Sequence, residues 1–231
     1  MALILQIETA TTSCSVVLAK DGYIVAVREV TERNIHAEVI TRFIEEVVNE
    51  CGFGFNDLDA IAVSAGPGSY TGLRIGISTA KGLCFALDKP LIAVDTLTAM
   101  AFGALKSGEI APTDHLLLCP MIDARRMEVY TAIFDKNLVQ IKPTAAEIID
   151  EHSFSDLLNK HQVLFFGDGA EKCREVLSHN PNALFLLDFV NSAAFITSLA
   201  QEKFKAGIFE NVALFEPFYL KDFIAGKKKA E

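Results

Sequence analysis

The chain has 231 residues, which is enough for one large domain or two small ones. Hydrophobic residues make up 51% and charged residues 22%, and these shares exclude a disordered chain and a collagen-like one. The formal net charge is −9, of which the last five residues contribute +2, so residues 1–226 carry −11. Because nucleic-acid affinity depends on Lys and Arg, the strong negative charge of residues 1–226 disfavours direct binding to DNA or RNA. It fits a basic partner or simple acidic solubility.

The cysteines and the N-terminal stretch indicate in which cellular compartment the protein is expected. Five cysteines occur singly, without CxxC spacing, and their number is odd, so reduced thiols in the cytoplasm are expected. The apolar stretch Ala2–Ile7 ends at Glu8 and is too short for a signal sequence or a membrane span. No membrane association is therefore expected. The five cysteines are Cys14, Cys51, Cys84, Cys119 and Cys173.

The first half of the chain alternates strand and helix patterns. Three strands rich in Ile, Leu and Val open it, and the turn Lys20-Asp21-Gly22 joins the second to the third. Apolar periodicity then predicts a first helix, and a second long helix follows a Gly-Pro-Gly-Ser turn. This order predicts an α/β fold with a mixed sheet and helical cover. The predicted elements are strands Ala2–Glu8, Ser13–Ala19 and Tyr23–Val30, helix Ile35–Cys51, strand Ala60–Ala65, helix Tyr70–Leu87, strand Leu91–Val94 and helix Thr96–Leu105.

The opening pattern returns in the second half. Both halves place a carboxylate, Glu8 or Asp123, at the end of the first strand and just before a hairpin, which predicts an internal duplication with an abridged second half. The segment Lys106–Asp114 is the predicted boundary, giving domains 1–107 and 108–231, the second with a short basic tail. The predicted elements are strands Leu116–Asp123, Met127–Phe134 and Leu138–Lys142, a mainly helical stretch Ala145–Lys160, strand Val163–Phe166, a helix from about Ala170 and helix Ser192–Lys205.

The segment Gly66–Gly76, with the sequence GPGSYTGLRIG, joins a buried strand to a helix. Unpaired backbone N–H groups and the helix dipole make this junction a candidate site for an anion or a nucleotide, with Ser69 as a contact. The alternative is an ordinary turn in which Ser69 caps the helix. No Gly-Lys-Ser/Thr triplet closes the segment, so it is not a P-loop. Arg125 and Arg126 are further candidates, which could face an anion or a partner's carboxylate, or form an exposed pair.

The two long helices of the first half carry the candidate docking surface. Gly72, Gly76 and Ala80 recur at i+4, and a glycine inside a helix costs up to about 1 kcal/mol against alanine. The close approach of another helix, from the same chain or from a partner, would offset this cost. Gly76→Phe is therefore expected to block pairing and to leave the isolated fold largely intact. The expected interface residues are Ile40, Phe43, Ile44, Val47, Gly72, Leu73, Gly76 and Ala80.

Several segments resemble the bacterial TsaB (YeaZ) family. Gly66–Gly76, followed by Ser78-Thr79-Ala80-Lys81-Gly82-Leu83, is similar to the GPGSFTGLRIG…AKGL signature of that family, which is highly specific. The resemblance spans nearly the whole chain. The other matching positions are Glu8–Thr11, His36, Ile122–Tyr130 and Pro217–Lys221.

The resemblance implies a protein of the actin-like ATPase superfamily with two ribonuclease-H-like halves, in agreement with the predicted duplication. It implies a non-catalytic partner of TsaD, the enzyme that transfers a threonylcarbamoyl group to the adenosine next to the anticodon in tRNA. The small ATPase TsaE is expected to join this pair, and tRNA is expected to be reached only through the complex. TsaD is expected to bind the first two helices, and the chain is expected to form a homodimer through the same face when TsaD is missing.

An active enzyme of the same fold, either an ATP-dependent phosphotransferase or a metallopeptidase-like protein, is the alternative. TsaD-type sequences carry two metal-binding histidines four residues apart, and Thr96 and Met100 stand at the matching places here. The loops expected to cradle phosphates, Glu8–Thr12 and Asp123–Arg126, lack glycine, and Glu8 replaces the usual Asp. We therefore expect no catalytic residue, no metal and no cofactor. A free-standing homodimer is a third alternative.

Overall fold

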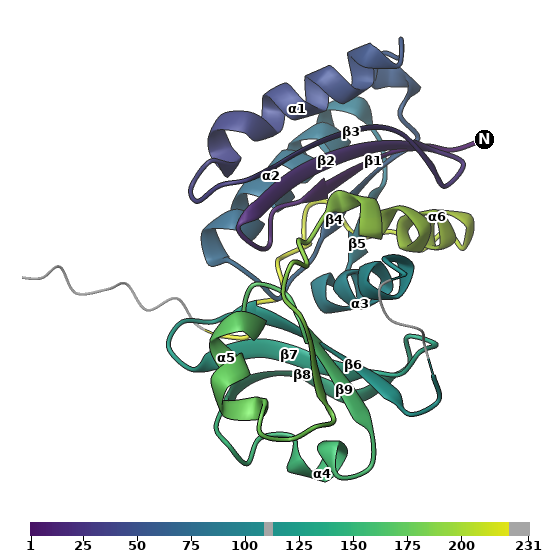
Figure 1. The fold of residues 1–231 in the computed structure, drawn as a ribbon. Helices are drawn as coiled ribbons and strands as arrows, with labels where there is room; N and C mark the ends of the chain where they lie inside the picture. The colour runs from purple at the N-terminus through teal and green to yellow at the C-terminus, as the bar shows by residue number, and fades with distance from the viewer. Residues whose placement is uncertain (109–112, 222–231) are drawn as a thin grey trace, which may run out of the picture.

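Two five-stranded sheets lie one above the other in the computed structural model of the chain (Figure 1). The structure describes residues 1–108 and 113–221. Part of the predicted boundary segment Lys106–Asp114 and the basic tail with Lys227–Lys229 therefore lie outside the described residues. Helices α3 (Thr96–Lys106) and α6 (Thr197–Lys205) lie between the two sheets.

The first sheet has the strand order β3-β2-β1-β4-β5. Strands β1, β2 and β3 are antiparallel neighbours, and β4 and β5 run parallel to β1. Every element predicted for this half is present, with its ends within one residue of the prediction. The elements are β1 (Leu3–Glu8), β2 (Ser13–Lys20), β3 (Tyr23–Thr31), α1 (His36–Glu50), the short 3-10 helix η1 (Phe55–Asp57), β4 (Ala60–Ser64), α2 (Tyr70–Leu87) and β5 (Leu91–Val94).

The second sheet has the order β10-β9-β6-β7-β8, which repeats the first when β6–β10 are matched to β1–β5. This repeated order confirms the predicted duplication and the two ribonuclease-H-like halves. The elements are β6 (Leu116–Asp123), β7 (Glu128–Phe134), β8 (Gln140–Ile148), α4 (Ser155–Leu158), β9 (Gln162–Phe166), α5 (Ala170–Leu177), β10 (Ala183–Leu186) and the 3-10 helix η2 (Ala193–Ile196).

The stretch Ala145–Lys160, predicted to be mainly helical, is mostly strand and turn. Strand β8 continues to Ile148, and α4 has only four residues. Ala145 and Ala146 are paired with β7, so pairing within the sheet overrides the helix propensity of alanine. Strand β10, which is not among the predicted elements, completes the sheet beside β9. The second half is therefore abridged in its helices, because α4 and α5 are short, whereas its sheet keeps all five strands.

Helices α1 and α2 cover the outer face of the first sheet, on the side away from the second half (Figure 1). Arg28 of β3 fixes α1 at the sheet edge, since its guanidinium donates to Glu46 at 2.8 Å and to Glu50 at 2.7 Å. The longer helix, α2, has 18 residues and ends at Leu87, and the next residue, Asp88, adopts a left-handed backbone conformation. Among the described residues, no helix combines the length and apolar composition that a membrane span requires.

Each half contributes a helix to the core of the other. Leu97 and Met100 of α3 pack on the second sheet, beside Leu118. After the second sheet the chain returns, and Ile196 and Ala200 pack on the inner face of the first sheet. The predicted domain boundary, between residues 107 and 108, falls just after α3 and stays a prediction.

Candidate functional site

The eight residues predicted to form the partner interface are buried in the chain's own core. Ile40 is 2% exposed, and Val47 and Leu73 are not exposed at all. Both helices turn these residues toward the first sheet, so the whole apolar stripe is used within the chain. A partner cannot reach these side chains in this conformation. The eight residues are Ile40, Phe43, Ile44, Val47, Gly72, Leu73, Gly76 and Ala80.

Gly72 and Gly76 allow the loop between β1 and β2 to lie directly against α2. A β-carbon at position 76 would overlap the side-chain hydroxyl of Thr9, and one at position 72 would overlap the Thr9 carbonyl oxygen. The stripe of small residues thus packs on the chain's own loop, which is the intramolecular alternative. The expectation for Gly76→Phe is corrected with it, because a ring at position 76 would displace Thr9 and damage the isolated fold.

The exposed side of α2 is made of other residues. Ser78, Gly82 and Phe85 follow one another at helical spacing and face solvent, and Phe85 is 87% exposed. A β-carbon at position 82 would meet no atom within 4 Å. Leu214, 77% exposed, lies alongside, because the Lys81 ammonium donates to the backbone carbonyls on either side of it. We call Ser78, Gly82, Phe85 and Leu214 the α2 face.

Glu8 is a buried carboxyl at the end of β1. Its Oε1 accepts hydrogen bonds from the Ala10 backbone N–H at 2.5 Å and from the Ser64 hydroxyl at 3.0 Å. Burial raises the pKa of Glu8 to about 7, against the opposing effect of hydrogen bonds from Ala10 and Ser64. The side chain has no exposed surface, and its hydrogen bond from Ser64 ties β1 to β4.

Two residues stand where TsaD-type sequences carry metal-binding histidines, and both are part of the packed fold. The Thr96 hydroxyl accepts a hydrogen bond from the Gly66 backbone N–H at 3.1 Å, and Met100 is buried in the core between α3 and the second sheet. His36 Nε2 lies 2.9 Å from the Thr11 carbonyl oxygen, which makes this nitrogen a donor to the loop. Within residues 1–108 and 113–221, no group of His, Cys, Asp and Glu has the arrangement of a metal site.

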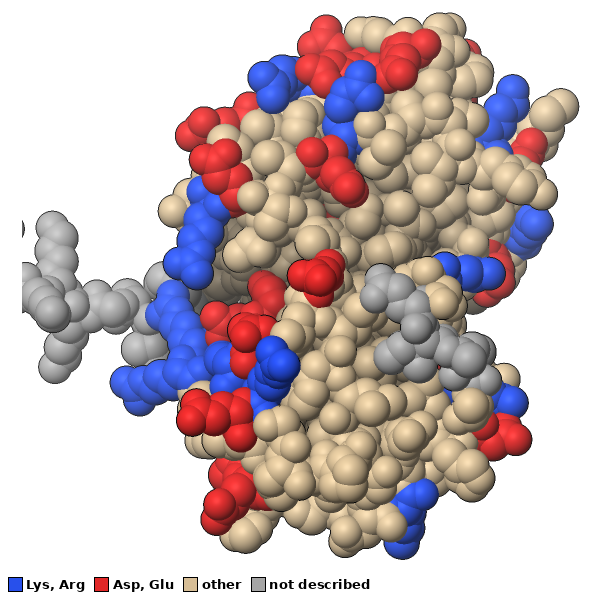
Figure 2. All heavy atoms as spheres, in the orientation of Figure 1, with Lys and Arg blue, Asp and Glu red and all other residues tan. Residues whose placement is uncertain are grey.

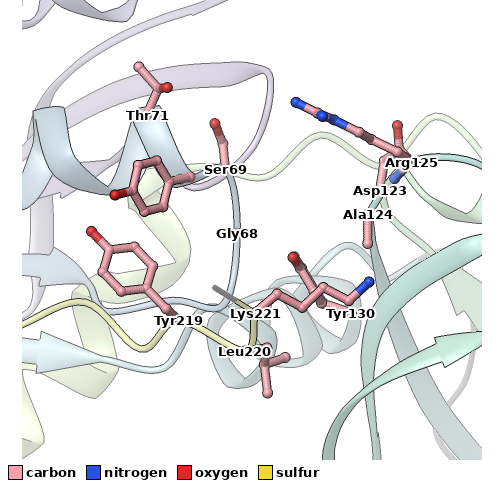
Figure 3. Close-up of a pocket in the computed structure, with 11 residues that line it drawn as sticks. Gly68, Ser69, Thr71, Asp123, Ala124, Arg125, Tyr130, Tyr219, Leu220 and Lys221 are labelled. Atoms are coloured by element: carbon pink, nitrogen blue, oxygen red, sulfur yellow. The ribbon is translucent and has the colours of Figure 1, made fainter. Parts of the chain in front are cut away.

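A cavity of about 430 Å³ lies between the two halves (Figure 3). Its walls come from the start of α2, the turn between β6 and β7, and residues 219–221. Arg125 reaches from the second half toward Ser69 of the first half. Ser69 also caps α2, because its hydroxyl accepts a hydrogen bond from the Gly72 backbone N–H at 3.2 Å. The structure thus brings Ser69 and Arg125 to one cavity, and Arg126 is not part of its wall.

Ion pairs within the chain neutralise the acidic side of the cavity. Asp123 forms an ion pair with Lys172, whose ammonium also donates to the Glu128 carbonyl oxygen at 2.6 Å. Asp168 accepts a hydrogen bond from the Asp123 backbone N–H at 3.0 Å, and burial raises the pKa of Asp168. Lys221 pairs with the Glu128 carboxylate. Figure 2 shows basic and acidic side chains gathered around a hollow between the halves.

The aromatic part of the cavity wall was not found from the sequence. The rings of Tyr70 and Tyr219 have their centres 4.9 Å apart. Arg74 lies 4.3 Å over the Tyr70 ring, and its Nε donates to the Tyr219 hydroxyl at 3.2 Å. Arg74 and Tyr219 are 145 residues apart, so no local spacing could have linked them.

Comparisons with known proteins bear on the family. The family model described as TsaD: tRNA N6-adenosine threonylcarbamoyltransferase matches residues 26–228. The chain is 39% identical over 127 residues to the tRNA threonylcarbamoyladenosine biosynthesis protein TsaB of Haemophilus influenzae, and 38% identical over 134 residues to TsaB of Escherichia coli. These matches cover 55% and 58% of this chain and 51% and 55% of the relatives, so the chain spans about half the length of the curated relatives it matches.

A solved structure shows that the fold is shared. YeaZ from Pseudomonas aeruginosa superposes with a TM-score of 0.80 at 23% identity, over 95% of this chain and 100% of that protein. The agreement therefore extends over both halves and the helices between them. Because the family model covers well over half of the residues, the chain belongs to the TsaD threonylcarbamoyltransferase family, as a relative of its TsaB (YeaZ) proteins.

Proposed function

We propose that the chain is a non-catalytic subunit required to form threonylcarbamoyladenosine at the adenosine next to the anticodon in tRNA. It binds and activates a TsaD-type threonylcarbamoyltransferase and helps to recruit the TsaE ATPase, and it meets tRNA only through that complex. The observation that carries this proposal is the family match, together with curated relatives named for threonylcarbamoyladenosine biosynthesis.

The α2 face is the proposed docking surface. Phe85 is 87% exposed beside the open position Gly82, so its ring is available to anchor a contact with a partner. A standard interface buries on the order of 1,600 Å² in total, which is more than this face offers alone. The exposed side of α1, next to α2 on the outer face, would supply the remainder (Figure 1).

Two features of the cavity and of β1 support a subunit without catalysis of its own. A phosphotransferase of this fold needs a carboxylate that is free to hold Mg²⁺ or to accept a proton. Asp123 is instead neutralised by Lys172, and Glu8 is sealed beneath the chain. Both carboxyl groups therefore act in the fold.

The same face accounts for the proposed homodimer. In the absence of the transferase, two copies can cover their α2 faces against each other, because a two-fold contact uses the same patch on both subunits. Formation of the homodimer and of the complex with the transferase would then exclude each other.

The test is co-expression of the chain with the TsaD-type transferase of the same cell, comparing Gly82→Arg with Ser178→Arg. Position 82 has open space around its β-carbon, and arginine favours a helix more than glycine does, so Gly82→Arg keeps the fold. Ser178 is an exposed residue at the end of α5, far from the α2 face. It therefore serves as a control that introduces the same side chain.

We expect Gly82→Arg to lose co-purification with the transferase and to leave threonylcarbamoyladenosine undetectable in the tRNA of cells that depend on this chain. Ser178→Arg should behave as the wild type in both measurements. Wild-type recovery of the complex with Gly82→Arg would contradict docking through the α2 face. Full modification in cells that lack the chain would contradict the proposed function itself.

A further inference from the structure

The segment that follows α6, residues 208–221, runs from β5 of the first sheet past α2 and reaches the second half at Glu128. It begins at the edge of the first sheet, where the Glu210 backbone N–H donates to the Leu91 carbonyl oxygen at 2.9 Å. We infer that this segment, called the strap, is a separable closing element. It latches the two halves and forms one wall of the cavity, and its release opens the cavity while both sheets stay folded.

The latch is made of a few contacts at the far end of the strap. The Phe218 backbone N–H donates to the Ala65 carbonyl oxygen at 2.8 Å. Next to it, the Tyr219 ring packs against Tyr70, and its hydroxyl accepts a hydrogen bond from Arg74. Beyond this point the Lys221 ammonium pairs with Glu128, and this ion pair joins the strap to the second half. Contacts of this partly exposed kind are individually weak, so the latch can open locally.

The strap is held less firmly than the sheets beneath it. Within the described chain its regular pairing is limited to the single bridge between Leu91 and Glu210. Phe215 and Tyr219 are half-buried against the first core, whereas Leu214 and Phe218 are exposed. By contrast, β1 and β4 are buried along their whole length. A segment with little pairing and partial burial opens at a lower free energy than the fold as a whole.

The strap connects the α2 face with the cavity. On one side, Lys81 of α2 holds it through the two carbonyls that flank Leu214. On the other side, Tyr219, Leu220 and Lys221 line the cavity. A partner that covers Leu214 contacts the strap in its closed position, and by linkage that partner stabilises the closed cavity. This last step rests on the proposed function, and the latch itself does not.

The tyrosines of the chain allow the opening of the strap to be measured by fluorescence. The chain has no tryptophan and four tyrosines, of which Tyr70, Tyr130 and Tyr219 line the cavity. The fourth, Tyr23, is 79% exposed, so the Tyr23→Phe variant confines tyrosine emission to the cavity. In this background, Lys81→Ala with Lys221→Ala removes strap contacts in its middle and at its far end and keeps all three reporters. The matched control is Lys136→Ala with Lys142→Ala, which removes two lysines from ion pairs elsewhere on the second half.

We expect acrylamide to quench tyrosine emission more strongly in the strap variant than in its control. In hydrogen exchange, the Phe218 amide should exchange about tenfold faster, while amides of β6 and β9 keep the wild-type rate. Tyr219→Phe, which loses the bond to Arg74 and keeps the ring, should give a smaller increase at the same amide. It serves as the test if the double variant does not fold.

Unchanged quenching and unchanged exchange at Phe218 would overturn the latch. An equal acceleration in β6 and β9 would also overturn it, because the strap would then open only with the whole fold. These measurements use the isolated full chain, so they are independent of the proposed function. Addition of the transferase to the wild type should slow strap exchange further. If no complex forms, the proposed function fails and the latch stands; if a complex forms without slowing exchange, the linkage is overturned.

Discussion

Thr9, in the loop between β1 and β2, occupies the space that a β-carbon at position 76 of α2 would need. The contact explains why a helix with 18 residues carries glycine at a position that costs helix stability. The close approach holds the start of α2 against the end of β1, where Glu8 lies. Gly76 is therefore a packing residue of the first half, and Gly82, on the open side of the same helix, is free of this constraint.

Substitution of these two glycines by alanine should have opposite effects. Gly76→Ala adds a methyl group where Thr9 stands, so we expect the free energy of unfolding to fall by about 1–3 kcal/mol. Gly82→Ala adds the same group in open space, and helix propensity should raise the free energy of unfolding by up to about 1 kcal/mol. Urea denaturation followed by circular dichroism measures both. Equal effects of the two substitutions would disprove the contact.

The stability of the fold should depend on pH through Glu8. Its pKa is raised from 4.5 to about 7 by burial, so the folded state keeps a proton that the unfolded state releases between these values. The contribution of Glu8 is therefore most favourable below pH 4.5 and is lost as the pH rises to about 7. At about 1.4 kcal/mol for each pKa unit, the loss amounts to about 3 kcal/mol.

Glu8→Gln is the variant that isolates this effect, because the amide stays neutral at every pH. We expect the difference in free energy of unfolding between Glu8→Gln and the wild type to shift in favour of the variant by about 3 kcal/mol from pH 4.5 to pH 8. Glu175→Gln makes the same change at an exposed position on α5 and is the matched control for the substitution itself. A difference for Glu8→Gln that stays constant with pH would contradict the raised pKa of Glu8.

Lys172 should contribute more to stability than a lysine in an ordinary surface ion pair. Its side chain is 24% exposed, and it reaches both the Asp123 carboxylate and the Glu128 carbonyl oxygen. We expect Lys172→Met to lower the free energy of unfolding by about 1–2 kcal/mol, since both acceptors lose a charged donor and keep the backbone N–H groups of Arg125 and Ala124. Lys142→Met, which breaks the more exposed pair with Asp156, should cost less than about 0.5 kcal/mol. Thermal unfolding of both variants at equal salt concentration makes the comparison, and equal losses would refute it.

The fold was predictable where one local signal dominated. Every predicted element of the first half ends within a residue of its prediction, because glycine, proline and aspartate turns separate long apolar runs. The stretch Ala145–Lys160 was predicted to be mainly helical, but pairing of its first residues with β7 decided the structure there. Strand β10 is a four-residue apolar run of the same length as β5, which was predicted, so its length does not explain why it was missed.

The candidate site was only partly predictable. Apolar spacing identified the inward face of α1 and α2 correctly as apolar, but a spacing pattern does not state whether a sheet or a partner covers that face. The structure assigns Ile40 and Gly76 to the core and leaves Phe85 outside. Ser69 and Arg125 meet at one cavity as candidates, yet Tyr219 joins them from the far end of the chain. Such a meeting depends on the return of the chain after the second sheet, which the sequence does not encode locally.

The most direct test of the account is the affinity of the purified chain for the TsaD-type transferase, measured by titration calorimetry for the wild type, Phe85→Ser and Tyr23→Ser. Both substitutions remove an exposed aromatic ring, Phe85 on the α2 face and Tyr23 on the edge strand β3. We predict that Phe85→Ser weakens binding at least about tenfold, as expected when the anchor of an interface is lost, and that Tyr23→Ser binds as the wild type does. Wild-type affinity of Phe85→Ser would contradict the claim that this chain acts by docking through α2.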